Sequence, residues 1–429
     1  MDTIFAVSSG APPAAIAVLR LSGSSAFAAA EALSGTLPEP RRAALRALRD
    51  PASGELLDRA LVLVFPGPRS ATGEDLAELH LHGGRAVVRA VEAVLAGLEG
   101  LRPAEPGEFT RRALSNGRLD LSEAEGLGDL LAAETEAQRR VAMRSAEGAV
   151  RREVERWEAR LLALAAHAEA LLDHSDEDDV AGFADPLPEL RRAATALADD
   201  VDAVAARPAV ERLRDGLRVV LAGPPNAGKS TLLNTLVGRD AAIVSAIAGT
   251  TRDRIEAPVM RGGVAWLFVD TAGLNEAPGD TIEEIGIARA RDALASADIL
   301  LWLDDAPPPE HPACLWIHAR ADEMGRAKGE GKDLSLSALT GEGIEALWER
   351  LARLAATLLP PPDMVALNQR QRGLCLDAAG ALRRAGGQAD LLLFAEELRS
   401  ARIAFDAITG RAGVEAMLDA LFGRFCIGK

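Results

Sequence analysis

Short runs of apolar residues separated by turn residues dominate the first part of the chain. Ile16 to Leu21, Leu61 to Phe65 and Leu76 to Leu81 are such runs, and the last ends at Gly83-Gly84. Apolar runs of this length bounded by glycine predict strands. We therefore expect a small α/β domain over about residues 1–117.

A different hydrophobic period begins after this region. From about 119 to 175 the strand pattern stops, and apolar residues recur at steps of three and four, namely at Val150, Val154, Trp157, Leu161, Leu164 and Leu171. That period predicts one long amphipathic helix.

Residues 217–355 alternate apolar runs with helical patterns, which predicts a parallel sheet. Pro360-Pro361-Pro362 ends this segment, and helical character resumes over 363–425. A helical region divided by an α/β segment indicates an inserted domain. The expected divisions are 1–117, 118–213 (first helical part), 214–356 (inserted domain) and 357–429 (second helical part).

Composition narrows the classes of protein that fit. The 429 residues hold 64 Asp+Glu against 48 Lys+Arg, a net charge of −16, which argues against broad attraction to a nucleic-acid backbone. Any RNA contact must be local or shared with a partner. No stretch of about 20 residues lacks charge and no signal peptide precedes the first run, so we expect a cytoplasmic protein without a membrane span. Three widely spaced cysteines (Cys314, Cys375, Cys426) indicate neither disulfides nor zinc.

The strongest chemical motif follows the apolar run Leu217 to Ala222. It reads Gly223-Pro-Pro-Asn-Ala-Gly-Lys-Ser230 and leads into a helix-forming segment, the context that a phosphate-binding loop requires. Glycines allow backbone N–H groups to wrap phosphates at a helix N-terminus. Lys229 is expected to bridge the β- and γ-phosphates and Ser230 to bind Mg²⁺.

Two further motifs fit the same site. Asp270-Thr271-Ala272-Gly273 stands at the carboxyl end of the run Ala265 to Val269, where open parallel sheets bind ligands. Asp270 suits the Mg²⁺ shell and the Gly273 N–H suits the γ-phosphate. A threonine of Gly249-Thr250-Thr251-Arg252-Asp253 can complete that shell.

The base-recognition motif is altered. After the run Leu315 to His318 comes Ala319-Arg320-Ala321-Asp322, where many GTPases carry Asn-Lys-x-Asp. Asp322 can accept from guanine N1–H and N2–H, whereas Ala319 cannot replace the asparagine amide, and the Arg320 stem can cover the base. Ser337-Ala338-Leu339 is the expected last base-contacting loop.

The residue that orients the attacking water is not fixed by spacing. Leu274 occupies the position at which Ras-like enzymes place a glutamine. Glu276, Glu283 and Glu284 are the acidic candidates, and the residues alone do not separate them.

Together these motifs and the terminal Cys426-Ile427-Gly428-Lys429 resemble the MnmE (TrmE) family of tRNA-modification GTPases over essentially the whole chain. Phe65 to Pro68 and Gly73 to Asp75 are further specific matches. The resemblance implies an N-terminal tetrahydrofolate-binding and dimerising domain, a discontinuous all-α helical domain and an inserted P-loop (Ras-like) GTPase domain. It also implies a homodimer that works with the flavoprotein MnmG, as a heterotetramer, on C5 of the tRNA wobble uridine.

The resemblance also assigns ligands. Asn226, Ser245, Ile247 and Thr250 would bind K⁺, Ser230 and Thr251 would bind Mg²⁺, and Glu283 becomes the preferred water-orienting residue. The full GTP-binding set would be Asn226, Ala227, Gly228, Lys229, Ser230, Thr231, Ser245, Ala246, Ile247, Ala248, Gly249, Thr250, Thr251, Asp270, Thr271, Ala272, Gly273, Asp322, Ser337, Ala338 and Leu339.

For the folate, a 5-formyl or methylene derivative, the resemblance points to Arg20, Glu78, Arg118 and Lys429. Arg118 replaces the usual lysine and keeps its charge while changing its geometry. Cys426 would be a reactive thiol near the folate or the modified base.

Two other functions are compatible with the residues. A dimeric scaffold with impaired GTP turnover is one, because of Ala319, and a ribosome-assembly GTPase is the other, although no RNA-binding module of the usual kind is evident. Seven arginines between 139 and 160 could form a tRNA-binding row, but interleaved glutamates favour salt bridges on the helix surface.

Overall fold

The computed structural model describes residues 2–173, 185–240, 256–270, 293–323, 331–361, 363–411, 422, 423 and 428. Two compact units divide the chain. The first joins the N-terminal 128 residues to the residues from 406 onward, and the second comprises residues 129–405. Each unit is described by itself below.

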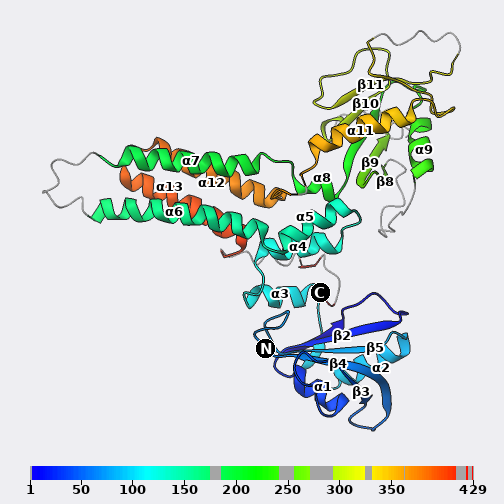
Figure 1. Cartoon of the computed structure of the whole chain (residues 1–429), viewed down its shortest axis with the longest axis vertical. Coiled ribbons are helices and arrows are strands. Elements are labelled where there is room, and N and C mark those ends of the chain that lie inside the picture. The colour runs from blue at the N-terminus through cyan, green and yellow to red at the C-terminus, as the bar shows by residue number, and fades with distance from the viewer. Residues whose placement is uncertain are drawn as a thin grey trace, which may run out of the picture. The chain divides into compact units, whose positions relative to one another are not determined.

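A six-stranded sheet forms the centre of the first unit (Figure 1). Its strands are β1 (Thr3–Val7), β2 (Ile16–Ser22), β3 (Ala44–Arg49), β4 (Leu56–Phe65), β5 (Leu76–His82) and β6 (Leu101–Pro103), in the order β3-β4-β5-β2-β1-β6. All neighbouring strands are antiparallel apart from the β1–β6 pair. The three predicted runs form β2, β4 and β5, whereas β1, β3 and β6 were not predicted.

The two faces of this sheet differ. Helices α1 (Ala26–Ser34) and α2 (Arg85–Ala96) bury their apolar side chains against one face. The other face leaves Ile16, Leu45 and Leu61 at 57%, 61% and 42% exposure. Leu45 lies opposite Leu61, and Leu61 lies opposite His80, so these side chains share one face.

The prediction of one long helix over 119–175 is wrong. The chain forms α4 (Leu121–Leu131), α5 (Glu136–Ala146) and α6 (Ala149–Asp173) instead, after the short α3 (Glu108–Ser115). Thr135 and Gln138 form a reciprocal capping box that starts α5. Gly148, at φ 80°, separates α5 from α6 because few other residues adopt that backbone conformation.

Four long helices form the helical part of the second unit: α6, α7 (Leu187–Ala205), α12 (Gln369–Gly387) and α13 (Leu391–Thr409). They lie side by side in Figure 1, with α7 packed along α12. The Trp157 ring stacks on Phe405 with centroids 5.7 Å apart, and both side chains are fully buried. Trp157 therefore joins α6 to α13.

Replacing Trp157 by alanine is expected to lower the free energy of unfolding of this helical region by about 3–5 kcal/mol, because it leaves a large cavity at the ring stack. Leu162→Ala on the same helix removes a side chain that is 64% exposed. That control should change the free energy by no more than about 0.5 kcal/mol. Urea-dependent hydrogen exchange of the α6 amides measures both, and equal effects would contradict the packing described.

Between α8 (Val210–Arg214) and α12 the chain builds a second six-stranded sheet. Its strands are β7 (Leu217–Ala222), β8 (Glu256–Arg261), β9 (Val264–Asp270), β10 (Ile299–Trp302), β11 (Cys314–His318) and β12 (Leu334–Ser335), in the order β12-β11-β10-β7-β9-β8. Only the β8–β9 pair is antiparallel among these neighbours. Helices α9 (Lys229–Asp240) and α11 (Ile344–Leu358) pack on one face.

No helix in the described part of the chain is long and apolar enough to span a bilayer.

Candidate functional site

The loop between β7 and α9 occupies the carboxyl end of the second sheet. Gly223 has φ 145°, and a Cβ there would lie 3.1 Å from the Leu303 carbonyl carbon, so a side chain would strain this turn. Lys229 opens α9, is 5% exposed, and its Nζ donates to the carbonyls of Gly223 and Pro224 at 2.8 Å each. The loop thus curls around its own lysine.

Burial lowers the pKa of Lys229, and the nearby Asp270 carboxylate partly opposes that shift. The ammonium group is therefore held where a polyphosphate would compensate its lost hydration.

Ser230 and Asp270 converge from two different elements. The Ser230 hydroxyl, in the first turn of α9, donates to Asp270 Oδ2 at 2.5 Å. Asp270 ends β9 and is 4% exposed. A hydroxyl and a buried carboxylate oxygen are hard ligands of the kind that Mg²⁺ prefers, so this pair fits the expected metal. A bound Mg²⁺ would neutralise phosphate charge beside Lys229.

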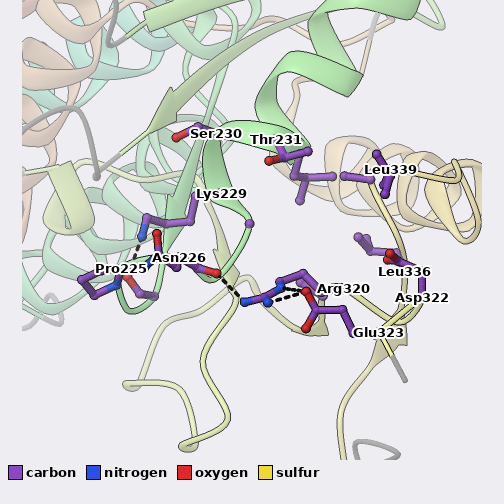
Figure 2. A pocket seen from close by; sticks show the side chains of 15 residues that line it. Pro225, Asn226, Lys229, Ser230, Thr231, Arg320, Asp322, Glu323, Leu336 and Leu339 are labelled. Atoms are coloured by element: carbon purple, nitrogen blue, oxygen red, sulfur yellow. Dashed lines mark hydrogen bonds and ion pairs between the residues drawn. The ribbon is translucent and has the colours of Figure 1, made fainter. Parts of the chain in front are cut away.

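A cavity of about 700 Å³ lies over this loop and extends toward the turn after β11 (Figure 2). That size suits a nucleotide. Its wall comprises Gly223, Pro225, Asn226, Gly228, Lys229, Ser230, Thr231, Leu232, Ala319, Arg320, Asp322, Glu323, Leu336, Ala338 and Leu339. The structure therefore brings most of the described members of the predicted phosphate and base motifs to one cavity, whereas Ala227, Asp270 and Ser337 are not among its wall residues.

Asp322, Ala338 and Leu339 line the part of the cavity in which the sequence predicts the base. A hydrogen bond from the Ser337 side chain holds the pKa of Asp322 below its usual value, so the carboxylate is ionised and able to accept. Thr235 in α9 donates to the Ala338 carbonyl at 3.0 Å, while Leu339 is 80% exposed. Ala319 is buried and presents only a methyl group.

Arg320 does not extend freely over the base space. Its Cγ lies beside Gly228, where an added Cβ would be 3.4 Å away, and its guanidinium contacts Asn226 and Glu323. Glu323 was not among the predicted site residues. Its position three residues after Arg320 could have predicted an ion pair between the two, since side chains of opposite charge at i and i+3 often meet.

The first unit places two of the folate candidates together. Arg20 on β2 lies opposite Glu78 on β5, and Nη2 and Nε of Arg20 donate to Glu78 Oε1 at 2.8 and 3.1 Å. Arg20 also lies 5.8 Å from the centre of the Phe109 ring. Arg118 lies beside Gly73, where an added Cβ would be 3.2 Å from its Cγ.

Histidines near this pair do not form a metal site. His80 Nε2 lies 3.3 Å from Glu78 Oε2, whereas His82 Nδ1 lies 2.7 Å from Asp58 Oδ1. Throughout the described ranges, no group of three or more His, Cys, Asp or Glu side chains is arranged to hold a metal ion.

Several predicted residues lie outside the described ranges, so their placement stays a prediction. They are Ser245, Ala246, Ile247, Ala248, Gly249, Thr250, Thr251, Thr271, Ala272, Gly273, Glu276, Glu283, Glu284, Cys426 and Lys429.

Two of the interleaved glutamates pair with arginines of the row on α5 and α6: Glu153 with Arg156 at 2.7 Å and Glu155 with Arg151 at 3.8 Å. Arg139 and Arg140 share Glu136, at 2.7 and 2.8 Å. Arg156 and Arg160 share Asp200 of α7, at 3.0 and 2.5 Å. Asp200 lies on another helix, so it could not be identified as a partner from local spacing.

Comparison with known proteins agrees with these motifs. Residues 3–118 match the family model "GTP-binding protein TrmE N-terminus", and residues 121–426 match "MnmE helical domain". The chain is 57% identical to the tRNA modification GTPase MnmE of Erythrobacter litoralis, with 100% of both chains covered. It is 58% identical to that of Rhizorhabdus wittichii, covering 100% of this chain and 97% of the relative.

Among solved structures, the cytosolic domain of the T. maritima FeoB iron transporter matches 46% of this chain and 98% of its own, at 19% identity and a TM-score of 0.23. That likeness is too slight to bear on the fold.

Proposed function

This chain belongs to the MnmE family of tRNA modification GTPases and hydrolyses GTP, and on that basis we propose a finer function for it. It is a potassium-dependent GTPase that acts in the cytoplasm with the flavoprotein MnmG. Together they convert C5 of the wobble uridine, U34, of certain tRNAs to the carboxymethylaminomethyl or aminomethyl form.

One observation carries the nucleotide part of this proposal: Lys229, Ser230 and Asp322 line a single cavity, and Asp270 contacts Ser230. Lys229 and the loop N–H groups hold the phosphates, while Asp322 accepts from guanine N1–H and N2–H. Ser230 and Thr251 hold Mg²⁺ and Glu283 orients the water.

Potassium completes the phosphate site in this proposal. Asn226, Ser245, Ile247 and Thr250 are its ligands by family resemblance. Asn226 lines the described cavity and has φ 63°, a backbone conformation that asparagine tolerates better than most residues. A cation there would supply the positive charge that an arginine finger gives other GTPases.

The packing of the helices supports an inserted GTPase domain. α7 packs along α12, although the whole second sheet lies between them in sequence. Residues 214–356 are then the insertion, with helical parts at 118–213 and 357–429.

Arg20 and Glu78 support a folate site on the first unit, joined in the proposal by Arg118 and Lys429. Ser8 Oγ donates to the Gly428 carbonyl at 2.8 Å, so the residue before Lys429 lies at the end of β1. Ala6 of β1 pairs with Arg20 of β2. This neighbourhood is compatible with a role for Lys429, and for the Cys426 thiol, beside the folate.

Arg20→Ala is expected to weaken binding of 5-formyltetrahydrofolate about tenfold or more, because hydrogen bonds to charged groups contribute about 1.5–3 kcal/mol. Calorimetric titration measures it. Arg89→Ala removes an exposed arginine from α2, which packs on the opposite face of the sheet, and should leave the affinity unchanged. Equal affinities of the Arg20 variant and the wild type would contradict the folate assignment.

The exposed apolar face that holds Ile16, Leu45 and Leu61 supports a homodimer. Arg20 and Glu78 are on the same face, because Glu78 and His80 are two residues apart on β5. A second copy would bury apolar side chains next to the folate site.

The rival function is a dimeric scaffold with impaired turnover, for which the missing asparagine at Ala319 is the argument. GTP turnover measured in K⁺ and in equimolar Na⁺ separates the two. The proposal predicts turnover at least about tenfold faster in K⁺, a value set by the charge stabilisation that one cation supplies. Absence of turnover in K⁺ at saturating GTP would favour the scaffold. Equal rates in both salts would show that turnover does not depend on potassium.

A further inference from the structure

Glu323 and Arg320 link the base end of the nucleotide cavity to its phosphate end. Arg320 Nη1 donates to the Asn226 carbonyl at 2.7 Å, and Arg320 Nε donates to Glu323 Oε1 at 2.6 Å (Figure 2). The guanidinium is therefore held from both sides. Arg320 has φ 59°, a backbone conformation that few residues other than glycine adopt, which directs its side chain toward the phosphate loop.

The sheet itself does not join these two loops. The base-contacting turn follows β11 and the phosphate loop follows β7, with β10 between them in the sheet. Arg320 and Asn226 are 94 residues apart in sequence, so their hydrogen bond crosses over β10 from one loop to the other. Ala319, at the start of the same turn, has no side chain with which to make such a contact.

We propose that Glu323 is a positioning residue for guanine nucleotides, which holds Arg320 against the Asn226 carbonyl and so fixes the spacing between Asp322 and the phosphate loop. A nucleotide is bound at both ends, and its affinity depends on how far those ends are ordered beforehand. The inference rests on this cavity being the GTP site. Glu323 lies outside every motif that identifies the site.

Glu323 permits a clean test because its side chain is 43% exposed and, among the residues that the structure describes, its carboxylate bonds to Arg320 alone. Exposed ion pairs contribute little to stability, so Glu323→Ala should fold and melt like the wild type in the absence of nucleotide. We expect its Kd for GDP, and its KM for GTP, to rise roughly three- to tenfold, as for loss of one charged hydrogen bond that orders a loop. The kcat at saturating GTP should stay within about twofold, since the phosphate-binding residues are intact.

A double-mutant cycle identifies the route of action. If Glu323 acts through Arg320, the double variant R320A/E323A should bind GDP no more weakly than R320A alone. Glu349→Ala is the matched control, because Glu349 pairs with Arg353 at 3.7 Å on the exposed side of α11, away from the cavity. It should bind GDP like the wild type.

Three results would overturn the inference: unchanged or tighter GDP binding by E323A, losses that multiply in the double variant, or a fall in kcat with KM unchanged. A wild-type chain that fails to bind GDP would instead refute the GTP site, whatever the Glu323 variants do.

Discussion

Replacing Lys229 by alanine is expected to reduce GTP turnover by about 10²- to 10³-fold, the cost of removing one preorganised group that stabilises transition-state charge. The Nζ is buried beside Asp270 and is held by two carbonyls of its own loop, so it is in place before the nucleotide binds. Removal also takes one donor from each of those two carbonyls, of which Pro224 keeps the Ala227 N–H at 3.3 Å. The variant should therefore bind GTP more weakly as well as hydrolyse it more slowly.

Phosphate release at saturating GTP and Mg²⁺ in KCl measures this effect, with nucleotide binding followed in parallel. Arg353→Ala removes a cation from an exposed pair on α11 and should leave turnover unchanged. A Lys229 variant that keeps at least half of the wild-type rate would show that another site hydrolyses GTP.

Asp322→Asn is expected to change the base that the site accepts. In the proposed site the carboxylate would accept from guanine N1–H and N2–H, whereas an amide can accept only one of these while its NH₂ group opposes the other. With about 1.5–3 kcal/mol for a hydrogen bond to a charged group, GTP affinity should fall roughly 10²-fold. Xanthosine triphosphate carries a carbonyl oxygen in place of the 2-amino group, so the variant should bind it better than the wild type does.

Turnover of both nucleotides by both proteins gives a four-way comparison in which stability effects cancel. Asp363→Asn is the control, because that carboxylate is 92% exposed and is absent from the cavity wall. Unchanged preference for GTP in the Asp322 variant would mean that the base is read elsewhere. The effect should be large because Ala319, with only a methyl group, supplies no second hydrogen bond to the base.

The strand, loop and helix that surround Lys229 could be predicted from the sequence because their determinants are local. The run Leu217 to Ala222 is β7 itself, and the glycine loop and Lys229 follow without a gap. Asp270 and Asp322 could be placed because the first ends a buried parallel strand and the second follows another, and such strands end at one edge of a sheet.

Other features depend on contacts between distant residues. β3 buries only one of its six residues, carries two arginines, and is defined by pairing with β4. The break between α5 and α6 depends on the single residue Gly148. An isolated glycine is tolerated within a helical pattern, so it does not by itself predict a break. The Glu323–Arg320–Asn226 link depends on a positive φ at an arginine, which no sequence pattern indicates.

Modification of the wobble uridine by this GTPase can be measured by mass spectrometry of tRNA from a strain that lacks the gene. Digested tRNA is compared from that strain, from the strain complemented with the wild type, and from the strain complemented with Lys229→Ala. We predict that C5 of U34 lacks the carboxymethylaminomethyl or aminomethyl group in the first and third strains and regains it in the second. Unaltered modification in the strain without the gene would show that this GTPase is not needed to modify U34.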